Sequence, residues 1–248
     1  MISLNMDIIL TITIILISIV QSIFGVGVLL FGTPLLILYN YDFEITLLIL
    51  LPISIVISFL QIVKNTTYID FVFFRRFLLY SIPFLMGFLS IGIHSNINFS
   101  MIIGFLLIVV SLKNSSDIIK KSLKYLSNYD RISFVVMGII HGLTNLGGAF
   151  LTAMVFNKQL SKKKMRSIIA ICYITFAIFQ IFTLTLLIGK DQVLHQFNIR
   201  FFLIGISTFL IVEKLVFSKM NIEKYEKSFS IFLFISGSSL FIKNIYGL

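Results

Sequence analysis

The chain has 248 residues, of which 58% are hydrophobic and 12% are charged, and its formal net charge is +10. The charged share is about half that of an average soluble protein, and the mean hydropathy is +1.05. A soluble domain needs a polar surface over its core, whereas a membrane protein presents apolar side chains to lipid. The composition therefore excludes a soluble globular domain and a disordered chain, and the single cysteine, Cys172, excludes an intrachain disulfide.

Eight stretches of the chain are long and apolar enough, or nearly so, to cross a membrane, which takes about 20 residues in a helix. In chain order they are about 6–39, 44–63, 71–92, 97–112, 132–157, 167–189, 199–217 and 228–246. The connections between them are short and polar, so none of them holds a soluble domain. Runs such as 45–56 do not alternate between apolar and polar residues, as the strands of a membrane barrel would. We therefore predict an all-α polytopic protein of the cell membrane, with residues 1–248 in a single membrane domain.

The basic residues lie in short stretches between the apolar runs, such as Lys162–Lys164 with Arg166. Lys and Arg beside transmembrane helices hold the orientation of the protein and contact anionic lipid head groups. We therefore expect the lipid bilayer, and no nucleic acid, as a partner, and we interpret this run as an interface anchor. With eight crossings the Lys and Arg residues divide 11 to 9 between the two sides, so the positive-inside rule does not decide the orientation. The first half alone favours a cytoplasmic N-terminus.

The first and fifth stretches each contain a glycine cluster, which reads QSIFGVGVLLFGTP at 21–34 and HGLTNLGGAFLT at 141–152. An offset of 120 pairs Gln21 with His141, Gly25 with Asn145, and Gly27 with Gly147. The chain thus divides into two repeats, about 1–120 and 121–248, of four spans each, and an even number of spans gives both the same orientation. The second copy has about 25 residues and reaches roughly 37 Å as a helix, so we predict one interrupted crossing in each half rather than a crossing and a return.

A glycine cluster inside an apolar run predicts a helix that is broken within the membrane. Glycine allows the backbone angles of a turn, but unwound backbone is tolerated only inside the bundle or beside a watery cavity, because lipid cannot pair its peptide groups. The helix after each break begins with free N–H groups and the positive end of its dipole, which attract an anion. The alternative is that the glycines only let helices pack closely. Because matching clusters occur in both halves, we favour the first interpretation, in which the breaks form the central site of a transporter.

Polar side chains accompany both glycine clusters. His141 and Asn145 are four residues apart, so they share a helix face, and Thr144 is adjacent. Polar groups at membrane depth usually face a cavity or a partner, so these three either contact a substrate or form hydrogen bonds that fix helix packing; His141 is also a candidate proton relay. Gln61 and Gln180, late in the second and sixth spans, either face the pore or cap a helix. The predicted substrate-binding residues are Gln21, Gly25, Gly27, Gln61, His141, Thr144, Asn145, Gly147, Gly148 and Gln180.

The order of these features resembles the TauE/SafE family, the sulfite and sulfonate exporter group, over nearly the whole chain. Members have two four-span halves, each of which opens with a glycine-rich motif followed by an apolar stretch and a proline. Gly25-Val26-Gly27 with Pro34, and Gly147-Gly148, occupy those places here, although Met154 replaces the second proline and both motifs hold fewer glycines than is usual. The resemblance implies export, or less often uptake, of small sulfur-containing or organic anions, coupled to an ion gradient.

No pattern in the chain points to catalysis, a cofactor or a metal. An intramembrane enzyme would need motifs such as His-Glu-x-x-His or Gly-x-Ser-x-Gly, which do not occur, and none of the three histidines has a second ligand at metal spacing. The acidic residues lie in or near connections, and we expect Glu213 to pair with Lys214 at a helix end. We therefore predict a secondary transporter of a small anion. A non-transporting scaffold or assembly subunit derived from the same fold is the alternative.

Overall fold

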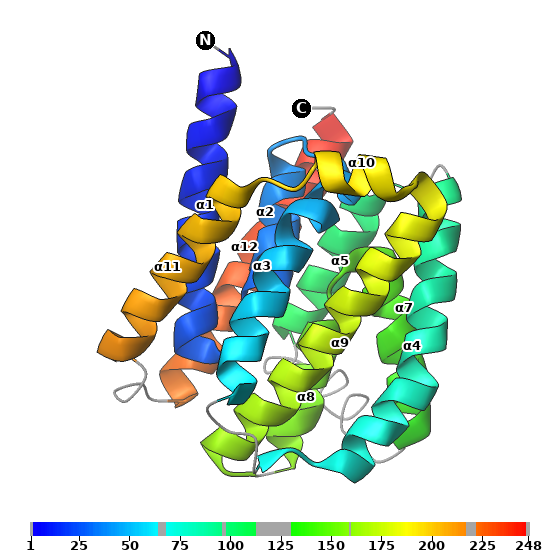
Figure 1. Cartoon of the computed structure of the whole chain (residues 1–248), viewed down its shortest axis with the longest axis vertical. Helices are drawn as coiled ribbons and strands as arrows, with labels where there is room; N and C mark the ends of the chain where they lie inside the picture. The colour runs from blue at the N-terminus through cyan, green and yellow to red at the C-terminus, as the bar shows by residue number, and fades with distance from the viewer. Residues whose placement is uncertain are drawn as a thin grey trace.

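The computed structural model describes residues 2–63, 68–95, 98–112, 130–158, 160–216 and 222–246. These parts of the chain form eleven helices and no strand (Figure 1). In chain order the helices are α1 (Ile2–Phe24), α2 (Val28–Leu38), α3 (Phe43–Val63), α4 (Phe71–His94), α5 (Phe99–Ser111), α7 (Asp130–Thr144), α8 (Gly147–Asn157), α9 (Lys162–Ile188), α10 (Lys190–His195), α11 (Ile199–Val216) and α12 (Ile222–Tyr246). The predicted all-α class is therefore confirmed for the described residues. The predicted boundary between the two repeats, near residue 120, lies outside them.

The outside of the bundle is suited to lipid. Among the described helices, three are long and apolar enough to cross a membrane by themselves: α3, α4 and residues Lys163–Ile188 of α9. Large apolar side chains are exposed on the outer helices, including Ile91 on α4, Ile211 on α11 and Phe234 on α12. A soluble monomer does not expose apolar side chains over so much of its surface, so the exterior matches a bilayer.

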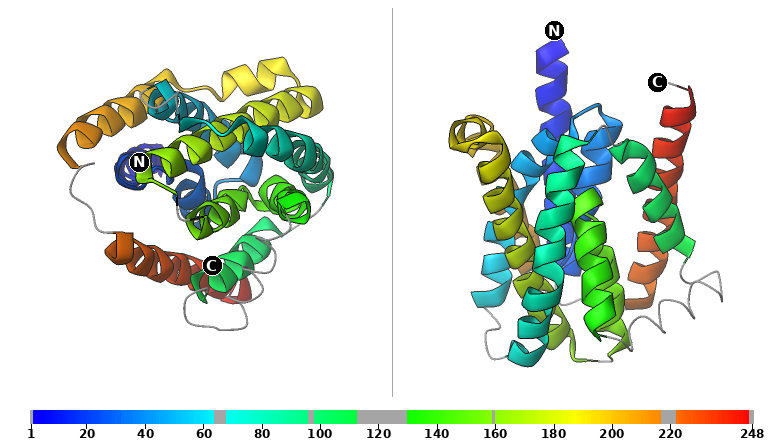
Figure 2. Two further views of the ribbon diagram at one scale, coloured as in Figure 1. Left: turned by 90° about the horizontal axis from the view of Figure 1, so that it is seen from below. Right: turned by 90° about the vertical axis from the view of Figure 1, so that its right-hand side faces the viewer.

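The two short helices α2 and α8 lie inside the bundle, and longer helices surround them (Figure 2). In α2 every residue from Val28 to Pro34 is buried, as expected for a helix that is apolar on all sides. The most extensive helix pairings are those of α4 with α7, α5 with α12, α3 with α9 and α1 with α11. Each of these pairings joins a helix from the first half of the chain to one from the second half, so the two halves share one core.

The chain folds back on itself between α1 and α2. A Cβ atom added to Gly27 would lie 2.7 Å from the backbone nitrogen of Gln21 and 3.1 Å from the carbonyl oxygen of Ile17. Residues ten apart in an uninterrupted helix are separated by about 15 Å, so α2 runs back beside α1. At the far end of α2, the carbonyl oxygens of Ile37 and Leu38 accept hydrogen bonds from Lys243 in the last turn of α12. The start of α1 and the ends of α2 and α12 therefore lie at one end of the bundle (Figure 1).

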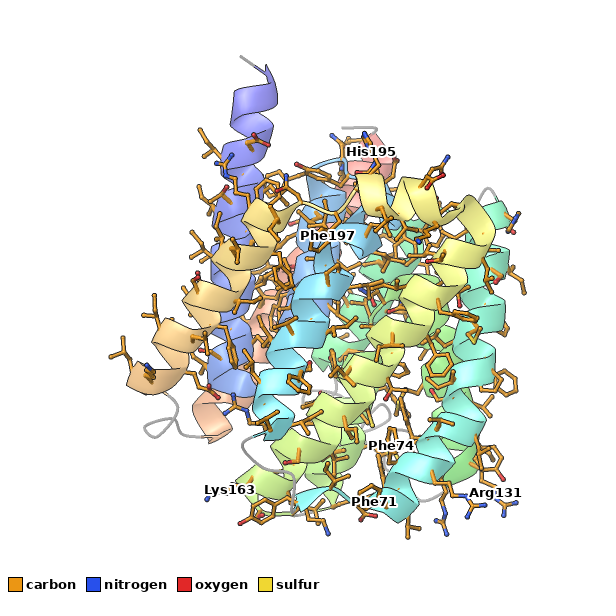
Figure 3. The ribbon with its side chains drawn as sticks, in the orientation of Figure 1. Phe71, Phe74, Arg131, Lys163, His195 and Phe197 are labelled. Atoms are coloured by element: carbon orange, nitrogen blue, oxygen red, sulfur yellow. The ribbon has the colours of Figure 1, made fainter. Side chains whose placement is uncertain are left out.

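The chain folds back in the same way between α7 and α8. A Cβ atom added to Gly147 would lie 2.6 Å from the Cβ atom of His141. Lys158, just after α8, places its ammonium group 4.8 Å from the centre of the Phe73 ring, near the start of α4. Arg131, at the start of α7, lies at the same end of the bundle (Figure 3). The α7–α8 hairpin therefore enters the bundle from the end opposite to the α1–α2 hairpin.

These hairpins show that the predicted single interrupted crossing in each half is wrong. Two complete crossings would need about 40 residues, but a hairpin that reaches only part of the way through the bundle needs two short helices. The helices α7 and α8 have 15 and 11 residues. The helices α3, α4 and α5 follow the first hairpin, and α9, α11 and α12, with the six-residue α10 between α9 and α11, follow the second. Because α3 and α9 start at opposite ends of the bundle (Figure 1), the predicted equal orientation of the two halves is also wrong.

Candidate functional site

The tip of the α1–α2 hairpin is held together by one glutamine. Gly25 adopts a positive φ of 78°, a conformation that glycine reaches without steric penalty. The side chain of Gln21, in the last turns of α1, spans the turn: its Oε1 accepts a hydrogen bond from the backbone nitrogen of Val28 at 3.0 Å, and its Nε2 donates to the carbonyl oxygen of Gly25 at 3.1 Å. The first peptide N–H of α2 is thus paired inside the bundle, where water does not reach it.

A second glutamine fastens this tip to α3. Gln61 donates from Nε2 to the carbonyl oxygen of Gln21, and Gln21 Nε2 donates to Gln61 Oε1, both at 3.3 Å. Ser54 and Ser58 lie on the same face of α3, two turns and one turn before Gln61. All four side chains are buried, and the two serine hydroxyls have no hydrogen-bond partner among the described residues. A polar strip along α3 therefore leads to the first tip.

The tip of the α7–α8 hairpin uses a different set of residues for the same turn. Asn145 adopts a positive φ of 61°, which asparagine tolerates better than other residues with a side chain. The hydroxyl of Thr144 donates to the carbonyl oxygen of Ile140 at 2.6 Å and accepts from the backbone nitrogen of Leu146 at 3.2 Å. At Gly148 a Cβ atom would overlap the hydroxyl group of Tyr173, so this start of α8 has room only for glycine.

A chain of hydrogen bonds connects the second tip to α9 and to the first hairpin. Gln180, on α9, accepts from His141 Nε2 at 3.2 Å through its Oε1 and donates from Nε2 to Asn145 Oδ1 at 3.2 Å. Asn145 Nδ2 then donates to the hydroxyl of Thr33 on α2 at 2.8 Å. With this assignment His141 carries its proton on Nε2, so Nδ1 of the neutral ring is an acceptor. That atom is buried and has no partner among the described residues.

The structure brings the predicted site residues together in two groups, one at each tip. Gln21, Gly25, Gly27 and Gln61 meet at the first tip. The second group is His141, Thr144, Asn145, Gly147, Gly148 and Gln180. Gln61 and Gln180 form side-chain hydrogen bonds with the hairpin tips. The five amide and imidazole side chains are at most 1% exposed, so both tips are enclosed by protein in this conformation.

A buried ion pair that was not predicted from the sequence lies beside the first tip. Arg166 Nη2 donates to Glu213 Oε1 at 2.8 Å, and both side chains are at most 7% exposed. The prediction that Arg166 belongs to an interface anchor is therefore wrong, and Glu213, for which the sequence suggested Lys214 as a partner, pairs with Arg166. A signal was present in the sequence, because Arg166 directly precedes the sixth apolar stretch and Glu213 is the innermost charged residue of the seventh. Thr33 was also missed, since a lone threonine in an apolar run carries no such signal.

A model of the family described as sulfite exporter TauE/SafE matches residues 10–240. The chain belongs to the TauE/SafE family. The matched region begins in α1 and ends in α12, so it contains both hairpins and every residue of the two tips. No curated protein and no solved structure matches the chain significantly. TauE/SafE proteins are integral membrane transporters, which confirms that this is a multi-pass membrane protein and shows a transporter family without showing the substrate.

The two ends of this TauE/SafE protein differ in charge. The helix ends on which they lie (Figure 1) place eleven Lys and Arg residues at described positions in the half of the bundle where α4, α7, α9 and α12 begin, and three in the opposite half. The eleven are Arg75, Arg76, Arg131, Lys158, Lys162, Lys163, Lys164, Arg166, Lys214, Lys224 and Lys227, and the three are Lys190, Arg200 and Lys243. Arg75, Arg76 and Arg131 also line a surface pocket of about 440 Å³ at the basic end.

Proposed function

We propose that this TauE/SafE protein is a secondary transporter that moves a small anion, such as sulfite or a sulfonate, across the cell membrane, and that the anion binds between the two hairpin tips. The observation that carries the proposal is the bond between Asn145, at the tip of one hairpin, and Thr33, on the inner helix of the other. Two short helices that enter from opposite ends and meet at buried polar groups are the usual construction of a transporter's central site.

The energetics of anion binding support this placement. A dehydrated anion at membrane depth is destabilised by several kcal/mol. A helix N-terminus returns roughly 0.3–2 kcal/mol, and a hydrogen bond to a charged group about 1.5–3 kcal/mol. The N-terminal ends of α2 and α8, with the amides of Gln21, Asn145 and Gln180, could nearly offset that penalty. The acceptor Nδ1 of His141 suits a protonated anion such as hydrogen sulfite, which carries one O–H donor.

We further propose that the two halves form an inverted repeat, each with one re-entrant hairpin and three crossings. Exchanging the halves turns the α4–α7 pairing into α11–α1, and leaves the α3–α9 and α5–α12 pairings unchanged. The four most extensive pairings are these four, which supports a twofold relation. Three crossings is an odd number, so the second half is inverted in the membrane. Inverted repeats suit alternating access, because the two halves can exchange conformations around a fixed site.

The charge distribution supports one orientation of this repeat. With the hairpins re-entrant, the described Lys and Arg residues divide eleven to three, whereas eight crossings divided the whole set 11 to 9. Cytoplasmic loops carry the excess of Lys and Arg, so we place the basic end in the cytoplasm. The start of α1 and the end of α12 then face the outside, which replaces the cytoplasmic N-terminus expected from the first half of the sequence.

Flux of labelled sulfite into proteoliposomes tests the proposed function. We expect the purified protein to carry sulfite across the vesicle membrane, and Asn145→Leu to reduce the flux by at least about tenfold while the protein remains folded and inserted. Sulfoacetate, thiosulfate and simple carboxylates tested in the same vesicles would define the substrate class. Absence of flux for all of these anions would contradict the transporter proposal and would favour the scaffold alternative.

A further inference from the structure

The ion pair of Arg166 and Glu213 touches the tip of the α1–α2 hairpin. Arg166 lies in the first turns of α9, and Glu213 lies near the end of α11, so the pair joins two helices at the basic end of the bundle. A Cβ atom on Gly25 would lie 3.2 Å from Cγ and 3.8 Å from Nε of Arg166. The guanidinium group is therefore adjacent to the turn from which α2 begins.

A buried ion pair is not explained by stability alone. Removing two charges from water is unfavourable, and replacing such pairs by apolar side chains often leaves a protein as stable or makes it more stable. Charged side chains inside membrane proteins therefore usually mark the path of an ion or substrate. This pair lies between the first hairpin tip and the basic end, so an anion that reached the tip from that end would pass close to it.

The electrostatics of the first tip call for a negative charge. The N-terminal end of α2 carries a partial positive charge from its dipole, and the Arg166 guanidinium adds a full positive charge beside Gly25. Two positive groups at one enclosed place repel each other unless an anion lies close to them. In this conformation the carboxylate of Glu213, 2.8 Å from Arg166, supplies that anion.

We infer that Glu213 occupies the place of the transported anion, and that a small oxyanion displaces its carboxylate from Arg166. This inference rests on the proposed transport function and adds the positive charge that the hairpin tips themselves lack. A guanidinium group binds two oxygen atoms of one planar or tetrahedral group side by side. Arg166 therefore selects carboxylate-like anions with at least two oxygens, such as sulfite and sulfonates, over chloride. Release follows when Glu213 returns to Arg166, so the anion is not trapped.

Sulfite binding to four variants of the ion pair and one control variant, in detergent or nanodiscs, tests the inference. Glu213→Gln removes the internal competitor while keeping the side-chain shape, and we expect the apparent Kd for sulfite to fall about tenfold, equal to about 1.4 kcal/mol. Sulfite should also raise the melting temperature of Glu213→Gln more than that of the wild type, because the anion replaces the lost partner of Arg166. Arg166→Gln should weaken sulfite binding at least tenfold, and Arg166→Lys less, because Lys keeps the charge but not the fork.

The double variant Arg166→Gln/Glu213→Gln separates binding from folding. It buries no unpaired charge, so we expect it to fold and insert but not to bind sulfite. Arg200→Gln is the matched control, since Arg200 forms an exposed pair with Asp7 at 4.0 Å, and its Kd should equal that of the wild type. Chloride should compete with sulfite in none of these proteins.

Two outcomes would contradict different claims. If the double variant binds sulfite as the wild type does, or if Glu213→Gln leaves the Kd unchanged, the ion pair only stabilises the fold and the inference is wrong. If the wild type binds and transports none of the tested anions, the proposed function itself is wrong. A wild type that transports sulfite together with an inactive double variant supports both.

Discussion

The α1–α2 hairpin turns through Gly25 and the α7–α8 hairpin turns through Asn145, both with positive φ angles. Each tip is bound by an amide from the next long helix, Gln61 in the first half and Gln180 in the second. The polar groups differ. The side chains of the first tip are amides, and the charged group of Arg166 lies beside them, whereas the second tip contains His141. The same backbone turn therefore carries different polar groups at the two tips, and in the proposed inverted repeat these groups would have different roles in holding a substrate.

The largest expected effect concerns the ends from which the two hairpins enter. In a Cys172→Ser background, single cysteines would replace His195, at the end of the bundle where α1 starts, and Lys163, at the opposite end, where α7 starts (Figures 1 and 3). We expect an impermeant maleimide to label His195→Cys in intact cells and Lys163→Cys only after the membrane is opened, because the proposed orientation places the basic end in the cytoplasm. Labelling of both positions in intact cells would contradict the proposed orientation.

The glycines at the two tips should be the most sensitive to added volume. Gly147→Val would place side-chain atoms within the space of His141, since even a Cβ atom would lie 2.6 Å from that residue. We expect a loss of about 1–3 kcal/mol in stability from overpacking and near-complete loss of sulfite flux, measured beside the amount of protein in the membrane. Gly87→Ala is the matched control, because nothing lies within 4 Å of its Cβ position.

Gly142→Ala should also reduce stability, unlike the control Gly87→Ala. A Cβ atom on Gly142 would lie 2.6 Å from the carbonyl oxygen of Leu85 on α4, so the alanine would push α7 away from α4. We expect this variant to lose stability while the chemistry of the tip is unchanged. If Gly147→Val retained normal flux, the second hairpin tip would not be part of the transport site.

Substitution of Asn145 separates the turn from the hydrogen bonds. Asn145→Leu places a branched side chain at a φ of 61°, which is unfavourable by roughly 1–2 kcal/mol, and it also removes the bonds to Thr33 and Gln180. Asn145→Gly keeps the turn and removes only the bonds. We expect both variants to lose about tenfold in sulfite flux, with the larger fall in melting temperature for leucine. Normal flux in both would contradict the role given to this residue.

The smallest expected difference is between the two glutamines. Gln180→Leu removes the hydrogen-bond partner of His141 Nε2 and of Asn145 Oδ1, whereas Gln61→Leu removes the two hydrogen bonds to Gln21. An unpaired buried polar group is unfavourable by about 1–3 kcal/mol, so Gln180→Leu should lower the melting temperature more. Equal effects would show that the two tips are held with similar strength, although their residues differ.

Several features of the fold could be predicted because they depend on nearby residues. The apolar composition requires a membrane, and the apolar stretches form helices because lipid leaves the backbone few alternatives. The helices α1 and α7 end within the glycine clusters, at Phe24 and Thr144. Gln21, His141, Gln61 and Gln180 were singled out because amides and an imidazole are rare in apolar runs, and their pairing across some 40 residues repeats in both halves.

The direction of the chain after each turn could not be predicted from the sequence. The residues of α2 and α8 are apolar on every side, so their pattern does not show whether they continue a crossing or fold back against α1 and α7. Whether the chain folds back also determines which connections lie on the same side of the membrane. With both hairpins folded back, the described Lys and Arg residues lie mainly at one end, whereas eight crossings divided all of them almost equally.

The sequence by itself determined the environment, the helices and the residues at the turns, because these depend on composition and on neighbours within a few positions. Only the tertiary structure decided that Arg166 pairs with Glu213 and that Asn145 reaches Thr33. The partners in these two bonds are 47 and 112 residues apart in the chain. Contacts over such separations depend on how whole helices pack and in which direction they run. The residue pattern within one apolar helix does not predict either.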